Sequence, residues 1–519
     1  MSENKLPQIP KEWKWVRLEK IGEIVTGTTP SKKNKEYYGK EIPFFKPPDL
    51  ESGRFVTKSQ EYLSKKGLEV ARLLPKNSIL VTCIGATIGK TGIIKVNGTS
   101  NQQINAIIPY EDYIIPEYIY YQIISPFFQE QIKKNATATT LPILNKSKFE
   151  KLFFSLAPLP EQQKIIEILE EAFSKIDAGV EGLKKIKKLL SLYRQSVLRY
   201  AFEGKLTQKW REENKDKLEP AEKLIEKIKK EREERYKQEL EEWKKACEIA
   251  KKEGKKKPPK PKPPKEFPPI TEEELKTLPQ IPKEWKWVRL GELINIFDSM
   301  RIPLNQQERN LRKKKRPLYP YYGATGKIDE IDEYIFDGEY VLLGEDGVQF
   351  FDKGKRKAYI VRGKFWANNH VHILKAVNGI KNLYLMHYFN IFDYHGYVTG
   401  TTRLKLNQSA MKNIPIPLSP FLEQQKIVEE IEYRLSIADK LEETVDKLLE
   451  KAEKLKQSYL KSAFEGKLTE EWRKQNPHLI TGENSVDILL EKIKEEKEKF
   501  EEKKKITKVK QKSLIELKQ

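Results

Sequence analysis

Thirteen consecutive residues with the sequence LPQIPKEWKWVRL occur twice in this chain, at positions 6–18 and again at 278–290. Two further strings recur in the same order, EQQKI from residues 161 and 423 and AFEGKLT from residues 201 and 463. Between these strings the two copies differ almost completely. Because identity of this length does not arise by chance, the sequence predicts two copies of one structural unit, in which a common frame holds two different inserts.

A heptad pattern follows each insert. Prolines at 158 and 160 end the first insert, and apolar residues then recur every seven positions from Leu169 to Val197. The second copy has the same pattern, and glycines at 204 and 466 stand where a C-terminal helix cap is expected. This predicts two long helices, each with an apolar seam. The predicted pairing residues are Leu169, Ile176, Leu183, Ile186, Leu190, Val197, Ile431, Leu441, Val445, Leu448 and Leu455.

A helix with one apolar seam needs a partner, and its duplicate in the same chain has a high effective concentration. We therefore expect the two helices to pair antiparallel, which gives the chain a pseudo-twofold axis. Packing of each helix on its own insert, or on another protein, remains the alternative. The expected fold class is α+β, with two mixed α/β globular domains joined by the antiparallel helices. The expected boundaries are globular domains at 1–160 and 278–422, helices at 161–203 and 423–465, a charged helix with a Pro/Lys-rich linker at 204–277, and a charged helical tail at 466–519.

The net charge of the chain limits the class of molecule that is expected to bind it. The chain has 98 Lys and Arg against 76 Asp and Glu, a formal charge of +22 in 519 residues. An excess of this size favours a polyanionic partner, and nucleic acid comes first. The sequence has no apolar stretch of membrane-spanning length and no signal peptide, and Cys83 and Cys247 are too few for a disulfide framework. These features predict a cytoplasmic protein.

Motifs for catalysis are weak. The string GATIGKTG at 85–92 resembles a phosphate-binding loop, but three residues separate its first two glycines where a Walker loop has four. A nucleoside triphosphatase that uses Lys90 is therefore a distant alternative. His370 and His372 alternate on a predicted strand and could bind zinc, yet the other histidines are far away in the sequence. The strings that a DNA methyltransferase needs are not found, so we expect no catalytic residue and no metal ligand.

Polar and basic side chains gather in loops of both inserts. Lys and Arg suit phosphate contacts, while Asn, Gln, Thr and Arg can bind base edges in the major groove. In a chain of such positive charge, these clusters favour contact with nucleic acid over a purely solvated surface. In the first insert the candidates are Thr29, Ser31, Lys32, Lys33, Asn34, Lys35, Tyr37, Tyr38, Thr87, Lys90, Asn101, Gln102, Gln103, Asn105, Thr137, Thr139, Thr140, Asn145 and Lys146. In the second they are Arg312, Lys314, Tyr321, Tyr322, Arg356, Asn368, Asn369, His370, Thr401, Thr402, Arg403 and Lys405.

The order of these segments resembles the specificity (S) subunit of Type I restriction-modification systems. The first insert contains GTTPSKKNKEYYGK, GATIGKTG and NQQINAI, and the second contains YYGATGKID, VLLGEDG and GKFWANNHVHIL. Each insert ends in a proline-rich string that leads into EQQKI. The resemblance covers nearly the whole chain and implies that each insert is a target recognition domain. Because the second insert lacks the TPS-type opening of the first, the two domains are expected to be different subtypes.

The resemblance implies a DNA-recognition subunit without chemistry of its own. Members of this family read a bipartite site in double-stranded DNA, one half with each recognition domain, and the paired helices fix the gap. Two unlike domains imply an asymmetric target. The implied partners are modification (methyltransferase) subunits, two of them expected, and restriction (motor/nuclease) subunits. S-adenosylmethionine, ATP and Mg²⁺ are expected on those partners, and no cofactor is expected on this chain. The alternative from another class is a non-catalytic coiled-coil scaffold that binds acidic proteins.

Overall fold

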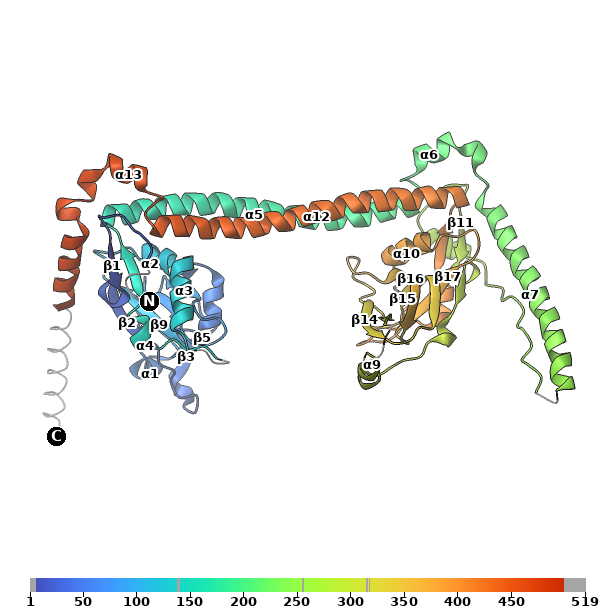
Figure 1. The fold of residues 1–519 in the computed structure, drawn as a ribbon, viewed down its shortest axis with the longest axis horizontal. Helices are drawn as coiled ribbons and strands as arrows, with labels where there is room; N and C mark the ends of the chain where they lie inside the picture. The colour runs from blue at the N-terminus through green and yellow to red at the C-terminus, as the bar shows by residue number, and fades with distance from the viewer. Residues whose placement is uncertain (1–5, 138–140, 254–255, 314–315, 317, 499–519) are drawn as a thin grey trace. The chain divides into compact units, whose positions relative to one another are not determined.

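The chain forms two compact units in a computed structural model that describes residues 6–137, 141–253, 256–313, 316 and 318–498 (Figure 1). Unit 1 consists of residues 1–183 together with 447–519, and unit 2 consists of the continuous stretch 184–446. The boundaries fall inside the two long helices, which are α5 (Leu159–Phe202) and α12 (Phe421–Phe464). Each unit therefore combines one globular domain with half of each long helix.

The globular domain of unit 1 contains a five-stranded sheet in the order β2-β9-β6-β7-β4, antiparallel except for β4, which is parallel to β7. Ile79 and Val81 of β6 pack on the side of α2 and α3, while Leu80 packs on the opposite side with Phe45. Both faces are buried, which explains the apolar run Ile79–Val81 in β6. The elements of the domain are β2 (Gly22–Thr26), β3 (Tyr38–Phe45), β4 (Phe55–Val56), β5 (Glu61–Leu63), α1 (Lys65–Glu69), β6 (Ile79–Thr82), β7 (Thr91–Ile94), β8 (Thr99–Ser100), β9 (Ile104–Pro109), α2 (Pro116–Ile123), α3 (Pro126–Asn135) and α4 (Lys146–Phe149), with β5-β3-β8 as a second sheet.

The domain of unit 2 repeats this topology with unlike residues. Its sheet has the order β12-β17-β15-β16-β13-β14, and β13 is parallel to the end of β16 as β3 is to β8 in unit 1. Val341 and Leu343 of β15 face one side of the sheet and Leu342 faces the other. The two inserts are therefore variants of one fold. The elements are α9 (Gln306–Arg312), β12 (Ile294–Ile296), β13 (Tyr319–Gly323), β14 (Gly326–Ile331), β15 (Phe336–Gly344), β16 (Ala358–Ala367), β17 (Val371–Ala376), α10 (Asn382–Ile391) and α11 (Gln408–Lys412).

The repeated string LPQIPKEWKWVRL supplies the first strand of each frame. In unit 1, β1 (Lys14–Arg17) pairs antiparallel with β10 (Phe153–Leu156), the strand that leads into α5. In unit 2, β11 (Lys286–Arg289) pairs in the same way with β18 (Pro415–Leu418), which leads into α12. Each two-stranded ribbon joins the start of a globular domain to its exit. The repeat is therefore structural.

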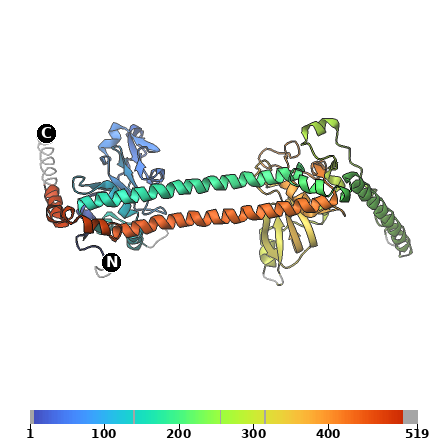
Figure 2. The same cartoon turned by 90° about the horizontal axis from the view of Figure 1, so that it is seen from above.

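The long helices pair antiparallel within each unit. In unit 2, Lys187 of α5 forms an ion pair with Asp446 of α12 at 2.7 Å, and Arg194 forms one with Asp439 at 2.5 Å. Residue numbers rise along α5 as they fall along α12, which fixes the opposite directions of the helices. In unit 1, the first half of α5 lies beside the last half of α12 (Figure 2). The predicted antiparallel pairing is confirmed.

One of the two predicted seam positions is correct and the other is wrong. The first seam position recurs every seven residues along α5. Leu169, Leu190 and Val197 are buried at this position, and Ile176 and Leu183 are half-buried. The second position of the seam lies four residues further on, not three. On α5 it holds Lys187 and Arg194, which reach carboxylates of α12; a search for apolar residues overlooks such side chains. The predicted pairing residues that are instead exposed by 42–49% are Ile186, Leu441, Leu448 and Leu455.

A buried carboxylate joins the repeated strings in unit 1. Glu161, the first residue of EQQKI, is fully buried. It accepts hydrogen bonds from Trp13 Nε1 at 2.8 Å and from the Thr469 hydroxyl at 2.6 Å, and it pairs with the guanidinium of Arg473. These partners come from LPQIPKEWKWVRL, from AFEGKLT and from the Trp-Arg pair that follows it. We call this arrangement the glutamate clamp of unit 1.

Unit 2 contains the same clamp built from the other members of the repeats. Glu423 accepts hydrogen bonds from Trp285 Nε1 at 2.8 Å, the Thr207 hydroxyl at 2.7 Å and Arg211 Nε at 2.8 Å. In each clamp, Trp and Glu belong to one copy of the repeat, while Thr and Arg belong to the other copy. Each unit is therefore completed by the segment that follows the other copy's long helix.

The segments after the long helices cover the globular domains. In unit 2, Leu224 and Ile228 of α7 (Ala221–Lys252) join the hydrophobic core. In unit 1, Leu489 and Ile493 of the helical residues 486–498 do the same. The remaining elements are α6 (Gln208–Glu213), α8 (Glu272–Thr277) and α13 (Glu470–Gln475). Of the helices formed by the described residues, none combines the length and apolar character needed to cross a membrane.

Candidate nucleic-acid interface

Four loops meet at one end of the main sheet of unit 1. They follow β2 and β6 and precede β9 and α4. Backbone hydrogen bonds connect them: the Cys83 amide donates to the Gln103 carbonyl at 2.7 Å, and the Leu144 amide donates to the Cys83 carbonyl at 2.8 Å. Thr28 donates to Ser100 in the same way at 2.9 Å. We call this surface loop face 1, made of residues 27–37, 83–86, 100–103, 137 and 141–146.

The same connections recur in unit 2. The Glu345 amide donates to the His370 carbonyl at 2.9 Å, and the Leu406 amide donates to the Glu345 carbonyl at 2.7 Å. The loops involved follow β12 and β15 and precede β17 and α11, the counterparts of those in unit 1. We call this surface loop face 2, made of residues 297–305, 345–347, 368–370 and 399–407. Two unlike sequences thus present loops on one common backbone arrangement.

Loop face 1 exposes cations beside hydrogen-bonding groups. Lys32, Lys33 and Lys35 follow β2 and are exposed, which suits contacts with phosphate. Gln102 is exposed in the neighbouring loop, and its side chain contacts the Thr29 hydroxyl. The other predicted residues exposed here are Ser31, Thr137, Asn145 and Lys146, and those that are half-buried are Thr29, Asn34, Tyr37, Tyr38 and Gln103. Thr139 and Thr140 lie outside the described residues.

Two asparagines that the sequence predicted as DNA contacts are buried in the domain. Asn105 is 2% exposed, and its side-chain oxygen accepts a hydrogen bond from the Thr26 hydroxyl at 2.8 Å. Asn101 is 7% exposed, and its amide donates to Gln103 at 2.9 Å. Burial removes both side chains from reach of a base. The prediction for them is corrected, because hydrogen bonds across the loops use their polar groups.

The GATIGKTG string divides between two surfaces. Gly85 adopts a positive φ of 107° and lies against Gln103 and Leu141, in loop face 1. Lys90 pairs with Glu51 at 2.5 Å and, together with Thr87, lines a pocket beside α3. Lys90 therefore lies away from loop face 1, and Thr87, which directly follows residue 86 of that face, lines the same pocket as Lys90, although the sequence predicted both as DNA contacts.

In loop face 2, the side chains of an arginine and a histidine both contact the same carboxylate. Arg403 Nε donates to Asp346 at 3.1 Å, and His370 Nδ1 lies 2.9 Å from the same carboxylate. The Arg403 side chain remains 60% exposed. Asp346 therefore orients the guanidinium without covering it. The neighbouring predicted residues Asn369, Thr401, Thr402 and Lys405 are also exposed.

A second carboxylate lies beneath this group. Glu345 pairs with Arg301 at 2.6 Å and with Lys405 at 3.0 Å. Burial alone would raise the pKa of the Glu345 carboxyl, but the hydrogen bonds from Arg301 and Lys405 outweigh burial and hold that pKa below its ordinary value. The carboxylate is therefore charged near neutral pH and anchors the cations of loop face 2.

Several predicted contacts of the second insert are buried or lie outside loop face 2. Tyr321 is 1% exposed and Asn368 is 8% exposed, so neither can reach a base. Arg312 of α9 pairs with Glu333 at 2.8 Å and lies over the ring of Trp366. Tyr322 packs in an aromatic cluster, Arg356 lines a pocket beside α12, and Lys314 lies outside the described residues. Burial corrects the predictions for Tyr321 and Asn368, while Arg312, Tyr322 and Arg356 lie outside loop face 2 and stay untested as DNA contacts.

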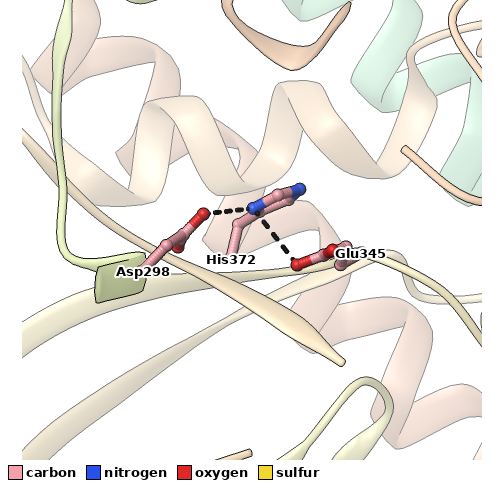
Figure 3. Close-up of side chains that lie close together, drawn as sticks. All are labelled: Asp298, Glu345 and His372. Atoms are coloured by element: carbon pink, nitrogen blue, oxygen red, sulfur yellow. Dashed lines mark hydrogen bonds and ion pairs between the residues drawn. The ribbon is translucent and has the colours of Figure 1, made fainter. Parts of the chain in front are cut away.

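The described residues contain one side-chain group with spacing suited to a metal, formed by Asp298, Glu345 and His372 (Figure 3). His372 Nδ1 lies 2.6 Å from Asp298, and its Nε2 lies 2.8 Å from the Leu406 carbonyl. Both ring nitrogens therefore already have a partner within hydrogen-bond distance, and Nε2 donates to a carbonyl oxygen, which can only accept. Burial would raise the pKa of Asp298, but the hydrogen bond from His372 lowers it. The group is an internal ion network that supports loop face 2.

Sequence reasoning missed the acidic members of this interface. Asp298, Glu345 and Asp346 were not among the DNA-contact candidates, because carboxylates repel phosphate and are normally excluded from a DNA-contact list. Their role is to position cations, which depends on pairs separated by 44 and 57 residues along the chain. No local pattern reveals such pairs. The sequence does contain a signal for the glutamates of the two clamps, because each of them is the first residue of the string EQQKI, which occurs in both copies.

Comparison with known proteins identifies the family. The family model described as the Type I restriction modification DNA specificity domain matches residues 10–188 and 282–451. The chain is 25% identical over 498 residues to the Type I restriction enzyme EcoDI specificity subunit of Escherichia coli, covering 94% of this chain and 96% of that one. It is 33% identical over 192 residues to the MjaIX specificity subunit of Methanocaldococcus jannaschii, covering 36% of this chain and 43% of that one.

A solved structure supports the fold. A chain from a structure described as the basis of complex assembly and conformational transition of the type I R-M system matches with a TM-score of 0.61. The match covers 89% of this chain and 99% of that chain at 16% identity. The family model covers both inserts and the start of both long helices, in the order that the repeats dictate. This chain belongs to the family of Type I restriction-modification DNA specificity subunits.

Proposed function

We propose that this chain is the DNA-recognition subunit of a Type I restriction-modification complex and that each unit reads one half of a split site in duplex DNA. The observation that carries the proposal is the pair of loop faces. Equivalent backbone hydrogen bonds connect three of the loops in both units, yet the side chains that the loops expose differ. Two domains that share a fold but expose different side chains are suited to the recognition of an asymmetric bipartite site.

Recognition on loop face 2 follows from its charges. Lys405 and Arg403 can neutralise phosphate or bind guanine, and Thr402 and Asn369 can contact base edges. Asp346 holds the Arg403 guanidinium in place before DNA arrives. Less rotamer freedom is then lost on binding, which favours affinity. Loop face 1 would use Lys32, Lys33 and Lys35 in the same positioning role.

The proposal is tested by selecting bound sequences from a random duplex library with the purified chain. The unmodified chain is expected to select two short motifs at a fixed separation. Arg403→Ala with Lys405→Ala is expected to relax one motif and leave the other intact, since a bidentate base contact supplies about 1–3 kcal/mol of discrimination. Sequencing of the bound fraction reports both halves at once.

Arg356→Ala provides the matched control, because Arg356 lies beside α12 and away from loop face 2. It should select the same two motifs as the unmodified chain. Relaxation of both motifs in the double variant, or of neither, would contradict the assignment of one half-site to each unit.

We further propose that two modification subunits dock on the exposed stripes of the long helices, and that these subunits supply S-adenosylmethionine while restriction subunits supply ATP-driven chemistry with Mg²⁺. This chain would be non-catalytic and cytoplasmic. Ile186 and Tyr193 of α5 are 44% and 39% exposed, and Leu448 and Leu455 of α12 are 42% and 48% exposed. These pairs occupy equivalent positions after EQQKI, so each unit offers one copy of the same apolar stripe.

Serine substitutions test the number of docking sites. Ile186→Ser with Tyr193→Ser should remove one of two modification subunits, because polar side chains replace the apolar surface that a partner helix would bury. Leu448→Ser with Leu455→Ser should remove the other, and the fourfold variant should bind none. Native mass spectrometry of the reconstituted complex gives the count. Leu192→Ser, at an exposed position of α5 outside the repeated stripe, is the control and should retain both. Retention of two subunits by the fourfold variant would contradict the docking site.

A further inference from the structure

An arm extends from unit 2 beyond its hydrophobic core. It consists of α7 from Arg232 onward and of the segment 256–270, which returns along the helix without helix or strand structure (Figure 1). The Trp243 indole donates to the Pro258 carbonyl at 2.8 Å, and Arg289 Nε donates to the Pro268 carbonyl at 3.3 Å. The returning segment is therefore held at both ends, against α7 and against the domain.

The returning segment presents one face to the protein and two faces to solvent. Pro258, Pro261, Phe267 and Ile270 are half-buried, and they are spaced by multiples of three residues. This is the period of the polyproline II helix, which needs no hydrogen bonds of its own. The lysines of the segment are all exposed, namely Lys256 and Lys257 before Pro258 and Lys260, Lys262 and Lys265 between the half-buried residues.

Charge at the outer end of the arm is uncompensated. The exposed lysines Lys244, Lys245, Lys251 and Lys252 of α7 adjoin those of the returning segment, and together these nine lysines outnumber the five neighbouring glutamates, which are Glu241, Glu242, Glu248, Glu253 and Glu266. None of these lysines forms an ion pair with another described residue. Elsewhere in unit 2 lysines do find carboxylates, as Lys187 does with Asp446. An external polyanion can supply the missing counter-charge.

We infer that this arm binds the backbone phosphates of duplex DNA outside the half-site read by loop face 2. The inference rests on the proposed function, because it assumes that the chain binds DNA. Lys256 to Lys262 span about 19 Å at polyproline II rise, equal to roughly five to six base pairs at 3.4 Å each. The arm leaves the long helices on the side that carries the domain of unit 2 (Figure 1).

The chemistry fits phosphate better than bases. Lysine is a point charge that contacts phosphate from many directions, and the arm offers no exposed Asn or Gln among the lysines of the returning segment. The prolines fix the backbone before binding, so little conformational entropy is lost. The contact would add affinity without sequence preference, and its strength would fall steeply with salt because each bound phosphate releases counterions.

The test uses the full chain with Lys256→Gln, Lys257→Gln, Lys260→Gln and Lys262→Gln together. Binding to a fluorescent random-sequence duplex of about 40 base pairs is measured over a KCl series, and the slope of log affinity against log salt should become shallower by up to about 3–4. Affinity at about 100 mM KCl should fall roughly tenfold or more. The control variant removes the same charge from the exposed helix lysines Lys185, Lys188, Lys440 and Lys451 and should change both quantities less.

The outcomes separate this inference from the proposed function. If the unmodified chain fails to bind duplex DNA, the proposed function fails and the arm proposal fails with it. If the unmodified chain binds DNA and the arm variant binds with the same slope and affinity, the arm proposal is overturned and the proposed function stands. Equal losses in the arm and control variants also overturn it, because net charge alone would then explain the effect. Thermal melting of both variants checks that each retains the fold.

Discussion

Glu423→Ala is expected to lower the free energy of unfolding of unit 2 by about 3–5 kcal/mol, the cost of leaving a buried charge without its partner. Glu423 is fully buried and accepts hydrogen bonds from Trp285, Thr207 and Arg211. Alanine leaves the buried Arg211 guanidinium uncompensated. Hydrogen exchange followed by mass spectrometry should show lost protection in peptides of unit 2 and unchanged protection in the domain of unit 1. Glu161→Ala should give the reverse result.

A surface ion pair is the control for this prediction. Arg194 pairs with Asp439, whose side chain is 70% exposed. Arg194→Ala should therefore lower the free energy of unfolding by about 1 kcal/mol or less. Replacing Arg211 by methionine in the Glu423→Gln background should recover part of the lost stability, since no buried charge then remains unpaired. A cost for Glu423→Ala no greater than that for Arg194→Ala would contradict the role of the clamp.

Lengthening both long helices is expected to widen the gap between the two half-sites and to leave their base sequences unchanged. Four residues inserted after Leu183 of α5 and four after Leu449 of α12 add about 6 Å and about 40° of rotation to each helix. One to two base pairs span a similar length at 3.4 Å each and rotate by a comparable angle. Sequences selected from a random library should therefore show a gap that is one or two base pairs longer.

The two insertion points lie opposite each other in the observed helix register. Lys456 meets Asp177 in unit 1, and Lys187 meets Asp446 in unit 2, with the same offset between the helices. Four residues inserted after Pro259, in the arm and outside both helices, make the control and should leave the gap unchanged. A changed base preference in either half after helix insertion, or an unchanged gap, would contradict the spacer role of the helices.

The repeats made the frame of this fold predictable. Strings of identical sequence mark β1 and β11 and the starts of α5 and α12, and the proline-rich strings that precede EQQKI mark where the helices begin. The sequence did not reveal that the two inserts share a sheet topology. That topology depends on which strands pair across the domain, such as β3 with β8 and β13 with β16, and these contacts leave no repeated residues.

The candidate interface was predictable in its kinds of residue and not in its geometry. Lysines after β2 and the Thr-Thr-Arg string at 401–403 lie on the loop faces, as a search for exposed polar loops expects. Asn105 and Tyr321 have equally suitable side chains but are buried, and only the folded chain distinguishes the two cases. The heptad seam gave a similar result, because its second position holds charged Lys187 and Arg194 while apolar Ile186 faces outward.

The central claim is that the two units read two unlike half-sites of one duplex. Mapping methylated bases across the DNA of cells that contain this chain with its modification subunits tests that claim most directly. We expect a single motif with two different defined halves separated by a gap of fixed length and unspecified sequence. A continuous motif without a gap, or two identical halves, would contradict it.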